Sequence, residues 1–258
     1  MLRIHNFKSK TNFGDQLVGP ILKWICNEDI KWVDSQYNGK LLCVGSELAL
    51  NLKKPNDVIW GYGAKLPRNI KIPPETKVLA LRGPNTALLV QGCQCKVFGD
   101  PALFTPRFYN PEGMKKIYDI CVIPHFTDAQ YFNINDPKIK VVDILSDKWE
   151  LINNMHRSNL ILSTSLHGCI VAEAYGFPVV WIKPKGSIVG GLEFKWNDYF
   201  SSTGRDEQEA FLLDDPITIP ALIKATSKIL PKAIINTTEL EKVWRDFYSS
   251  NEIGRIKE

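Results

Sequence analysis

The sequence predicts an α/β protein in which two parallel β-sheets, each with its own helices, face a common cleft. Short apolar runs alternate along the chain with segments of helical hydrophobic spacing, a pattern typical of parallel α/β folds. The pattern stops in residues 100–113, where three prolines and a glycine indicate a linker, and then starts again. The chain of 258 residues is long enough for two compact domains. Together these observations predict two Rossmann-like halves.

The first half is expected to form a domain of residues 1–108. Helical spacing of Leu17, Ile21 and Ile25 predicts a helix over residues 15–26. A second helix is expected to begin at Pro84, because proline suits the first helical position. The predicted strands are, in chain order, residues 30–34, 40–44, 58–60, 77–81 and 96–98.

The second half is expected to form a domain of residues 114–232. Its predicted strands are residues 119–124, 139–144, 160–163 and 179–182, and its predicted helices are residues 147–156, 167–175 and 219–230. A last helix is predicted over residues 237–248, with Thr237 as its N-cap and Leu240, Trp244 and Phe247 on its buried face. The segment 233–258 that contains this helix is expected to cross back onto the first half.

Composition and charge exclude several classes of protein. Lys and Arg exceed Asp and Glu by 32 − 28 = 4 without clustering, so no nucleic-acid partner is expected. No run of about 18 apolar residues and no N-terminal secretion signal is present. We therefore expect a cytoplasmic location, at most with peripheral contact at the inner face of the membrane. Of the six cysteines only Cys93 and Cys95 are close, and none has zinc-ligand spacing, so reduced structural thiols are expected.

In open α/β sheets, ligands bind beyond the carboxyl ends of the strands. The strongest candidate segment in the second half is residues 163–168, where an apolar strand ends and a helix begins. His167, the hydroxyls of Ser163 and Ser165 and the free backbone N–H groups of the helix N-terminus would all face the cleft and favour an anion. A capping turn with a surface histidine explains the segment equally well. His125 and Lys183 follow other strands at the same edge of this sheet.

The first half has three candidate segments, two at strand ends and one in the loop before the first helix. Arg82 lies between a strand and a helix, where its guanidinium can grip a carboxylate or phosphate, or else pair with a local surface acid. The loop from Asn12 through Gly14 to Asp15 leads into the first helix, and Asp15 alone is better explained as a helix cap or first-turn acid. Gly45-Ser46 follows a further strand, and Gly45 would let the backbone approach a ligand closely.

Taken together, Arg82, His125, His167 and Lys183 predict a cleft for a small, multiply charged anion. No carboxylate cluster faces these residues, so no metal is expected. Neither G-x-x-x-x-G-K-[ST] nor G-x-G-x-x-G occurs, which argues against ATP hydrolysis and NAD binding.

Several of these segments, in this order, resemble the polysaccharide pyruvyl transferase family. The matching residues are Asn12-Phe-Gly14-Asp15, Gly45-Ser46, Leu81-Arg82-Gly83-Pro84-Asn85-Thr86, Gly99-Asp100-Pro101 and Ser163-Thr-Ser165-Leu166-His167-Gly168, followed by Ala174-Tyr175-Gly176-Phe177-Pro178. The resemblance implies a two-domain arrangement similar to that of GT-B glycosyltransferases. It also implies phosphoenolpyruvate as donor substrate, with no further cofactor.

The family resemblance further implies a sugar acceptor, expected in a lipid-linked oligosaccharide of bacterial cell-surface polysaccharide biosynthesis, such as capsule or exopolysaccharide. The product would be a pyruvate ketal bridging two hydroxyls of one sugar. Carried over by motif, Arg82 would hold the donor, Leu166 and Gly168 would lie at the donor site, and His167 would be the general acid.

This sequence departs from the family pattern at Ser165, where several members place an arginine two residues before the histidine. Lys183, Lys185, Arg107 and Arg205 are the candidates for the missing charge. Two other functions remain open at this stage: a glycosyltransferase of the same fold that uses a nucleotide sugar, and a non-catalytic module that binds a glycan or an anion.

Overall fold

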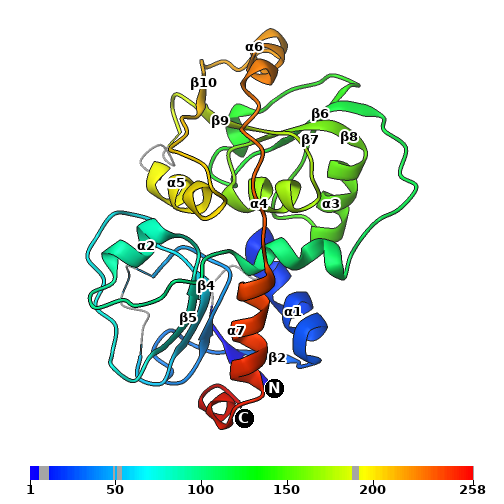
Figure 1. The fold of residues 1–258 in the computed structure, drawn as a ribbon. Helices are drawn as coiled ribbons and strands as arrows, with labels where there is room; N and C mark the ends of the chain where they lie inside the picture. Colours follow the sequence, from blue (N-terminus) through cyan, green and yellow to red (C-terminus); the bar gives the residue numbers. More distant parts are fainter. Residues whose placement is uncertain (6–11, 49, 51–53, 188–191, 258) are drawn as a thin grey trace.

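The computed structural model of the chain describes residues 1–5, 12–48, 50, 54–187 and 192–257. Two parallel five-stranded sheets with flanking helices lie one above the other in Figure 1, which confirms the predicted α/β class. The first sheet contains β1 (Leu2–Ile4), β2 (Ile30–Trp32), β3 (Leu41–Leu42), β4 (Val58–Tyr62) and β5 (Lys77–Leu81). Its helices are α1 (Phe13–Cys26) and α2 (Pro84–Leu89).

The second sheet contains β6 (Tyr118–Ile123), β7 (Ile139–Val141), β8 (Ser158–Ser163), β9 (Val179–Pro184) and β10 (Phe211–Leu213). The helices of this half are α3 (Lys148–His156), α4 (Leu166–Ala174), α5 (Glu193–Ser202) and α6 (Ile219–Ala225). Helix α7 (Thr238–Tyr248) follows.

Both sheets have the same strand order. The first runs β2-β1-β3-β4-β5 and the second, read from its other edge, runs β7-β6-β8-β9-β10. In each sheet the order in which successive strands are added reverses between two neighbouring strands. These are β1 and β3 in the first sheet, and β6 and β8 in the second. Ligands of open α/β sheets bind at such switch points, beyond the carboxyl ends of the two strands. The strand order therefore marks one candidate region in each half.

Some elements differ from the sequence-based prediction. Strand β1 was not predicted, because three residues are too few to show a strand pattern. Helix α5 was not predicted either, since Lys195 and Asp198 lie on its buried side and obscure its apolar face. Strand β10 is another three-residue element that escaped prediction. Residues 96–98 form no strand and contribute only a single bridge, from Phe98 to Leu81.

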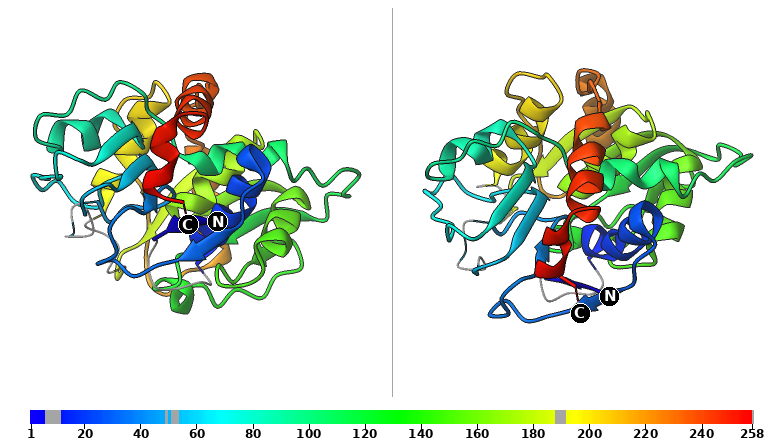
Figure 2. Two further views of the ribbon diagram at one scale, coloured as in Figure 1. Left: turned by 90° about the horizontal axis from the view of Figure 1, so that it is seen from below. Right: turned by 60° about the horizontal axis from the view of Figure 1, so that its bottom comes forward.

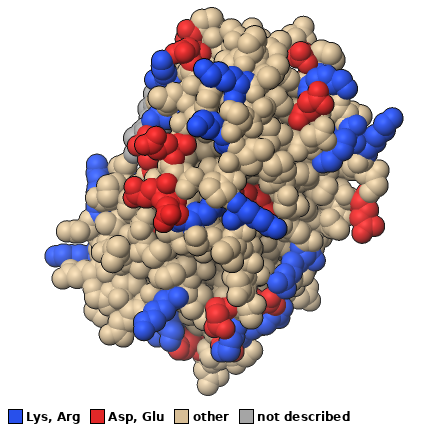
Figure 3. Space-filling model, turned by 45° about the horizontal axis from the view of Figure 1, so that its top comes forward, with Lys and Arg blue, Asp and Glu red and all other residues tan. Residues whose placement is uncertain are grey.

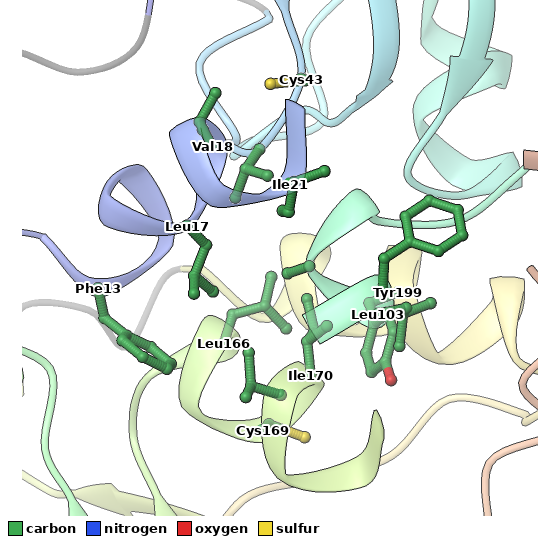
Figure 4. Packing of buried hydrophobic residues seen from close by; sticks show 14 of the residues in the cluster. Phe13, Leu17, Val18, Ile21, Cys43, Leu103, Leu166, Cys169, Ile170 and Tyr199 are labelled. Atoms are coloured by element: carbon green, nitrogen blue, oxygen red, sulfur yellow. The ribbon is translucent and has the colours of Figure 1, made fainter. Parts of the chain in front are cut away.

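The first part of the predicted linker, residues 100–105, is a buried part of the fold. Residues Pro101–Arg107 form a 3-10 helix, η1, capped by Asp100, whose side chain accepts a hydrogen bond of 2.9 Å from the Ala102 N–H. Helix η1 packs against α1 of the first half and α4 of the second. Figure 4 shows Leu17 of α1, Leu103 of η1 and Ile170 of α4 in one cluster. A single hydrophobic core therefore runs through both halves.

Helix α7 returns to the first half, where it packs against β4 and β5 (Figures 1 and 2). Its Trp244 stacks on Trp60 of β4 with ring centroids 4.6 Å apart, and the Trp60 indole N–H donates to the Leu240 carbonyl. Beyond α7, the Arg3 N–H donates to the Ile256 carbonyl, so the ends of the described chain lie together (Figure 2).

The described helices include none with the length and apolar character needed to span a bilayer. On the face shown in Figure 3, basic and acidic side chains are interspersed.

Candidate active site

The two switch points face each other across a cavity of about 380 Å³. Each strand end that meets there contributes residues to the wall. The lining consists of Asn12, Asp15, Gly45, Ser46, Glu47, Tyr62 and Lys65 from the first half, and His125, Phe126, Thr127, Ser165, Leu166, His167, Leu192 and Lys195 from the second. The structure thus brings together eight residues that the sequence singled out: Asn12, Asp15, Gly45, Ser46, His125, Ser165, Leu166 and His167.

His167 lies in the first turn of α4, and its side chain is 13% exposed. Its Nε2 is buried and faces the Oδ2 of the fully buried Asp100 at 3.5 Å. On the other side, Gly14 of α1 lies against the imidazole, so that a Cβ at position 14 would be 2.6 Å from Cε1. Gly14 does not line the cavity but permits this close approach. The atom of the ring nearest to Gly14 is Nδ1, so the imidazole is held between a carboxylate on its Nε2 side and helix α1 on its Nδ1 side.

The N-terminus of α4 forms part of the wall beside His167. Ser165 is the N-cap, and its hydroxyl accepts a hydrogen bond of 3.4 Å from the Gly168 N–H. The first backbone N–H groups of a helix have no partner within it and favour an anion. Ser163 lies behind this turn, fully buried, with its hydroxyl near the Ile123 and Ser165 carbonyls. Ser163 therefore shapes the turn rather than the cavity surface.

Gly168 has a packing role. A Cβ at this position would lie 2.7 Å from Ser163 Oγ and 2.9 Å from Ile123 Cγ2. Glycine thus lets α4 approach β6 and β8 closely, and residue 168 is not part of the cavity wall. The donor-site role expected for Gly168 from the resemblance does not match its position.

His125 lines the cavity but does not carry the positive charge that the sequence-based prediction assumed. Burial, followed by the nearby charges of Lys195 and Lys65, lowers its pKa to about 3. Its Nδ1 accepts a hydrogen bond of 3.4 Å from the Thr127 backbone N–H and lies 2.8 Å from the Thr127 hydroxyl. With Nδ1 accepting, Nε2 carries the proton, and the neutral ring offers the cavity an N–H donor.

Two lysines that sequence reasoning did not select supply positive charge to the cavity. Lys65 follows β4 and lies 3.7 Å from Glu47, which also lines the wall. Lys195 lies on α5 and is 7% exposed. Burial and the charges of Arg82 and Lys65 lower its pKa to about 7. Sequence reasoning missed Lys195 because the helix that carries it was not predicted.

Arg82 is fully buried and does not line the cavity. Its guanidinium forms an ion pair of 2.9 Å with Asp198 of α5, donates to the Ala64 carbonyl at 2.7 Å and bonds the Ser46 hydroxyl. The expectation that Arg82 projects into the cleft is thus not met, because Asp198, 116 residues away, satisfies its charge. Arg82 instead holds Ser46, which does line the wall.

The cations expected to replace the family arginine lie elsewhere and are paired. Lys183 borders a separate small pocket and bonds Glu193 at 2.7 Å. The other three candidates form the ion pairs Lys185–Asp214, Arg107–Glu241 and Arg205–Glu173.

The remaining predicted residues shape the first-half wall. Gly45 has a φ of +155°, and a Cβ there would lie 2.8 Å from Tyr62 Cζ, so glycine admits the tyrosine ring rather than a ligand. Asn12 donates to Asp15 Oδ2 at 3.2 Å in the first turn of α1. Phe126 is 44% exposed and lies opposite these residues in the wall.

The cavity combines an imidazole backed by a carboxylate, two lysines, a neutral histidine donor and a helix N-terminus. This arrangement can bind a small oxyanion and pass a proton to it or to an atom attached to it. Among the described residues, no group of three or more His, Cys, Asp or Glu side chains is arranged to hold a metal ion.

Comparison with known proteins supports the resemblance seen in the sequence. A family model described as polysaccharide pyruvyl transferase matches residues 46–186, more than half of the chain. The succinoglycan biosynthesis protein ExoV of Rhizobium meliloti (strain 1021) is 30% identical over 156 residues, which cover 56% of this chain and 46% of that protein. The uncharacterized protein L143 of Acanthamoeba polyphaga mimivirus is 29% identical over 225 residues, covering 81% of this chain and 77% of that protein. No solved structure gives a significant match.

Proposed function

The chain belongs to the polysaccharide pyruvyl transferase family, and we propose that it moves pyruvate from phosphoenolpyruvate onto two hydroxyls of one sugar as a ketal. The observation that carries this proposal is the His167 imidazole, fixed between Asp100 and Gly14 on the wall of a cavity that Lys65 and Lys195 also line. The donor is a small molecule with a carboxylate and a phosphate, and its reactive methylene carbon must be protonated. Lys65 and Lys195 can bind the carboxylate and the phosphate, and His167 can protonate the methylene carbon.

In the proposed reaction, the imidazolium of His167 gives a proton to the methylene carbon of the donor. The buried Asp100 carboxylate stabilises the imidazolium through Nε2, and their 3.5 Å separation can shorten once a ligand is bound. Protonation leaves an oxocarbenium-like carbon, which the first sugar hydroxyl attacks. Phosphate then leaves by cleavage of its C–O bond, and the second hydroxyl closes the ketal. Of the two hydroxyl protons, one returns to His167 and the other leaves on the phosphate.

The cavity wall carries aromatic side chains from both halves, Tyr62 from the first and Phe126 from the second. Tyr62 and the exposed Phe126 border the space, and an aromatic face suits the apolar face of a sugar ring. We propose that they contact the acceptor, and that Asp15 or Glu47 accepts one hydroxyl proton and passes it to the departing phosphate. The similarity to ExoV supports an acceptor in polysaccharide biosynthesis, for which we propose a lipid-linked oligosaccharide of a bacterial cell surface.

The proposed arrangement is a GT-B-like pair of domains, residues 1–108 and 114–232, with the site between them. The segment 233–258 belongs with the first domain in this proposal, in keeping with the packing of α7 on β4 and β5. Proposed roles then follow the halves: the first binds the acceptor and the second binds the donor.

The test is release of inorganic phosphate from phosphoenolpyruvate in the presence of candidate acceptor glycans. We expect release by the wild-type protein and a fall of about 10²–10⁴-fold or more in His167→Gln, since a positioned acid contributes about this factor. His156→Gln is the matched control, because His156 packs against Tyr175 and Phe177 away from the cavity. Full activity of a folded His167→Gln variant would reject His167 as the acid. Turnover of a nucleotide sugar without phosphate release would instead support the glycosyltransferase.

A further inference from the structure

Helix α5 places an uncompensated cation on the cavity wall. Lys195 is 7% exposed, and its ammonium group has no hydrogen bond or ion pair with any other residue in the described part of the chain. Removing a charge from water is costly unless a partner of opposite sign accompanies it. The cost is visible in the Lys195 pKa, which burial lowers to about 7.

The charged groups around Lys195 do not compensate it. Arg82 and Lys65 repel it and lower its pKa further, whereas Asp128 and Glu47 act in the opposite direction and more weakly. Glu47 lies 3.7 Å from Lys65. Asp128 accepts a hydrogen bond of 2.7 Å from the Ser187 hydroxyl at Oδ1, and its buried Oδ2 has no hydrogen-bond partner among the described residues. Within the described residues, neither acid forms an ion pair with Lys195. His125, also on the wall, is neutral at physiological pH because burial lowers its pKa to about 3.

A clamp one helical turn away fixes the side of α5 that carries Lys195 against the first half. The Asp198 carboxylate accepts from the Thr86 N–H at 2.6 Å, from the Thr86 hydroxyl at 2.7 Å and from Arg82 Nε at 3.0 Å. Residues 195 and 198 are three apart and lie on the same side of α5. All three residues of the clamp are fully buried. The fold therefore holds a lysine on the wall, and the described residues give it no counter-ion in direct contact.

We propose that Lys195 is the anion anchor of the cavity and that a dianionic oxyanion, the phosphate of the donor, supplies its missing counter-charge. This inference rests on the proposed function only for the identity of the ligand. In the free protein, the ammonium form of Lys195 is destabilised by burial. The bound anion stabilises that form, so binding above pH 7 is accompanied by uptake of a proton.

The experiment is titration calorimetry with inorganic sulfate as the probe, because sulfate keeps its charge over the whole range from pH 7 to pH 9. We expect wild-type affinity to fall by up to about tenfold per pH unit above pH 7, as Lys195 loses its proton. Lys195→Met should bind at least tenfold more weakly at pH 7 and lose most of this pH dependence. Lys195→Arg, which stays charged, should bind at pH 9 nearly as tightly as at pH 7.

Lys183→Met is the matched control, because Lys183 pairs with Glu193 outside the cavity and should leave sulfate affinity unchanged. The melting temperature provides a second readout. Replacing an unpaired buried ammonium by an isosteric apolar side chain should raise it, so loss of binding in Lys195→Met is not loss of the fold.

A folded Lys195→Met variant that binds sulfate within twofold of wild type at pH 7 would overturn the inference. Equal affinity of the wild-type protein for sulfate at pH 7 and pH 9 would also overturn the inference. These outcomes are distinct from failure of the proposed function. If Lys195→Met loses sulfate binding but the wild-type protein releases no phosphate from phosphoenolpyruvate with any acceptor, the anchor stands and the donor assignment falls.

Discussion

The His125 imidazole shows how a single residue in the cavity wall can make stability depend on pH. Its pKa is about 3 in the folded protein and near 6.5 in the unfolded chain, chiefly because burial disfavours the charged ring. Between these two values the unfolded chain binds a proton that the folded protein does not. Folding stability therefore falls as the pH drops from 6.5 towards 3, and the contribution is constant above 6.5.

This difference predicts that His125→Gln is less sensitive to acid than the wild-type protein. At pH 4 we expect the wild type to lose roughly 3 kcal/mol more stability, relative to pH 7.5, than the variant loses. Urea unfolding of both proteins at a series of pH values measures this difference in stability loss. At pH 7.5 the His125 imidazole is neutral in both the folded and the unfolded protein. The difference in stability between wild type and variant at this pH therefore measures the loss of the Thr127 contact, which is subtracted. Parallel stability curves for the two proteins between pH 4 and 6.5 would show that His125 remains charged when folded.

At the scale of elements, the site is formed by loops that follow the switch-point strands of both sheets. The register pairs Ile123 of β6 with Ser163 of β8, which places the loops carrying His125 and His167 next to each other. In the first half, Ile4 of β1 pairs with Leu41 of β3. These pairings explain why residues far apart in sequence meet in one cavity: each lies just beyond a strand that ends at the same sheet edge.

The same geometry determines what the sequence could reveal. The rule that ligands bind beyond strand ends selects Ser46, His125 and His167 without any knowledge of pairing across the chain, and all three line the cavity. It fails for Arg82, which also follows a strand, because the partner that withdraws it from the cavity lies on α5. Long-range ion pairs leave no local signal. Lys195 was missed for the related reason that a polar residue on the buried side of a short helix weakens the hydrophobic pattern.

Contact between α1 and α4 gives a prediction at this scale. Gly14→Ala should reduce turnover at least tenfold, because its Cβ would overlap the His167 ring and displace it from Asp100. On helix propensity alone, the same change would be neutral or stabilising.

Gly19→Ala is the matched control in the same helix. Its Cβ would meet only the end of the Ile30 side chain, at 3.3 Å, so activity should be retained. Steady-state phosphate release from phosphoenolpyruvate and thermal melting of both variants test the pair. Equal activity of Gly14→Ala and Gly19→Ala would show that the imidazole is not confined by α1.

At the scale of the whole molecule, the two halves are joined by more than a chain crossover. The hydrophobic core that contains Trp60 in the first sheet also contains Ile161 in the second. Phe104 of η1 lies at this junction, with its ring centroid 5.8 Å from that of Trp60 and 5.5 Å from that of Trp24. The Arg82–Asp198 ion pair adds a fully buried polar link between β5 and α5. Large hinge opening would therefore have to expose core residues and separate a buried ion pair.

A continuous core predicts that the protein unfolds as one cooperative unit. Hydrogen exchange in increasing denaturant should give the same opening free energy for β4 in the first half and β8 in the second. Phe104→Ala should lower both values together by about 3–5 kcal/mol, because truncating a buried phenylalanine leaves a cavity at the junction. If the halves were independent domains, the substitution would lower protection in β4 alone and leave β8 unchanged. Equal losses would mean that the geometry of the cavity between the switch points is as stable as the fold itself, so that a ligand meets a preformed site.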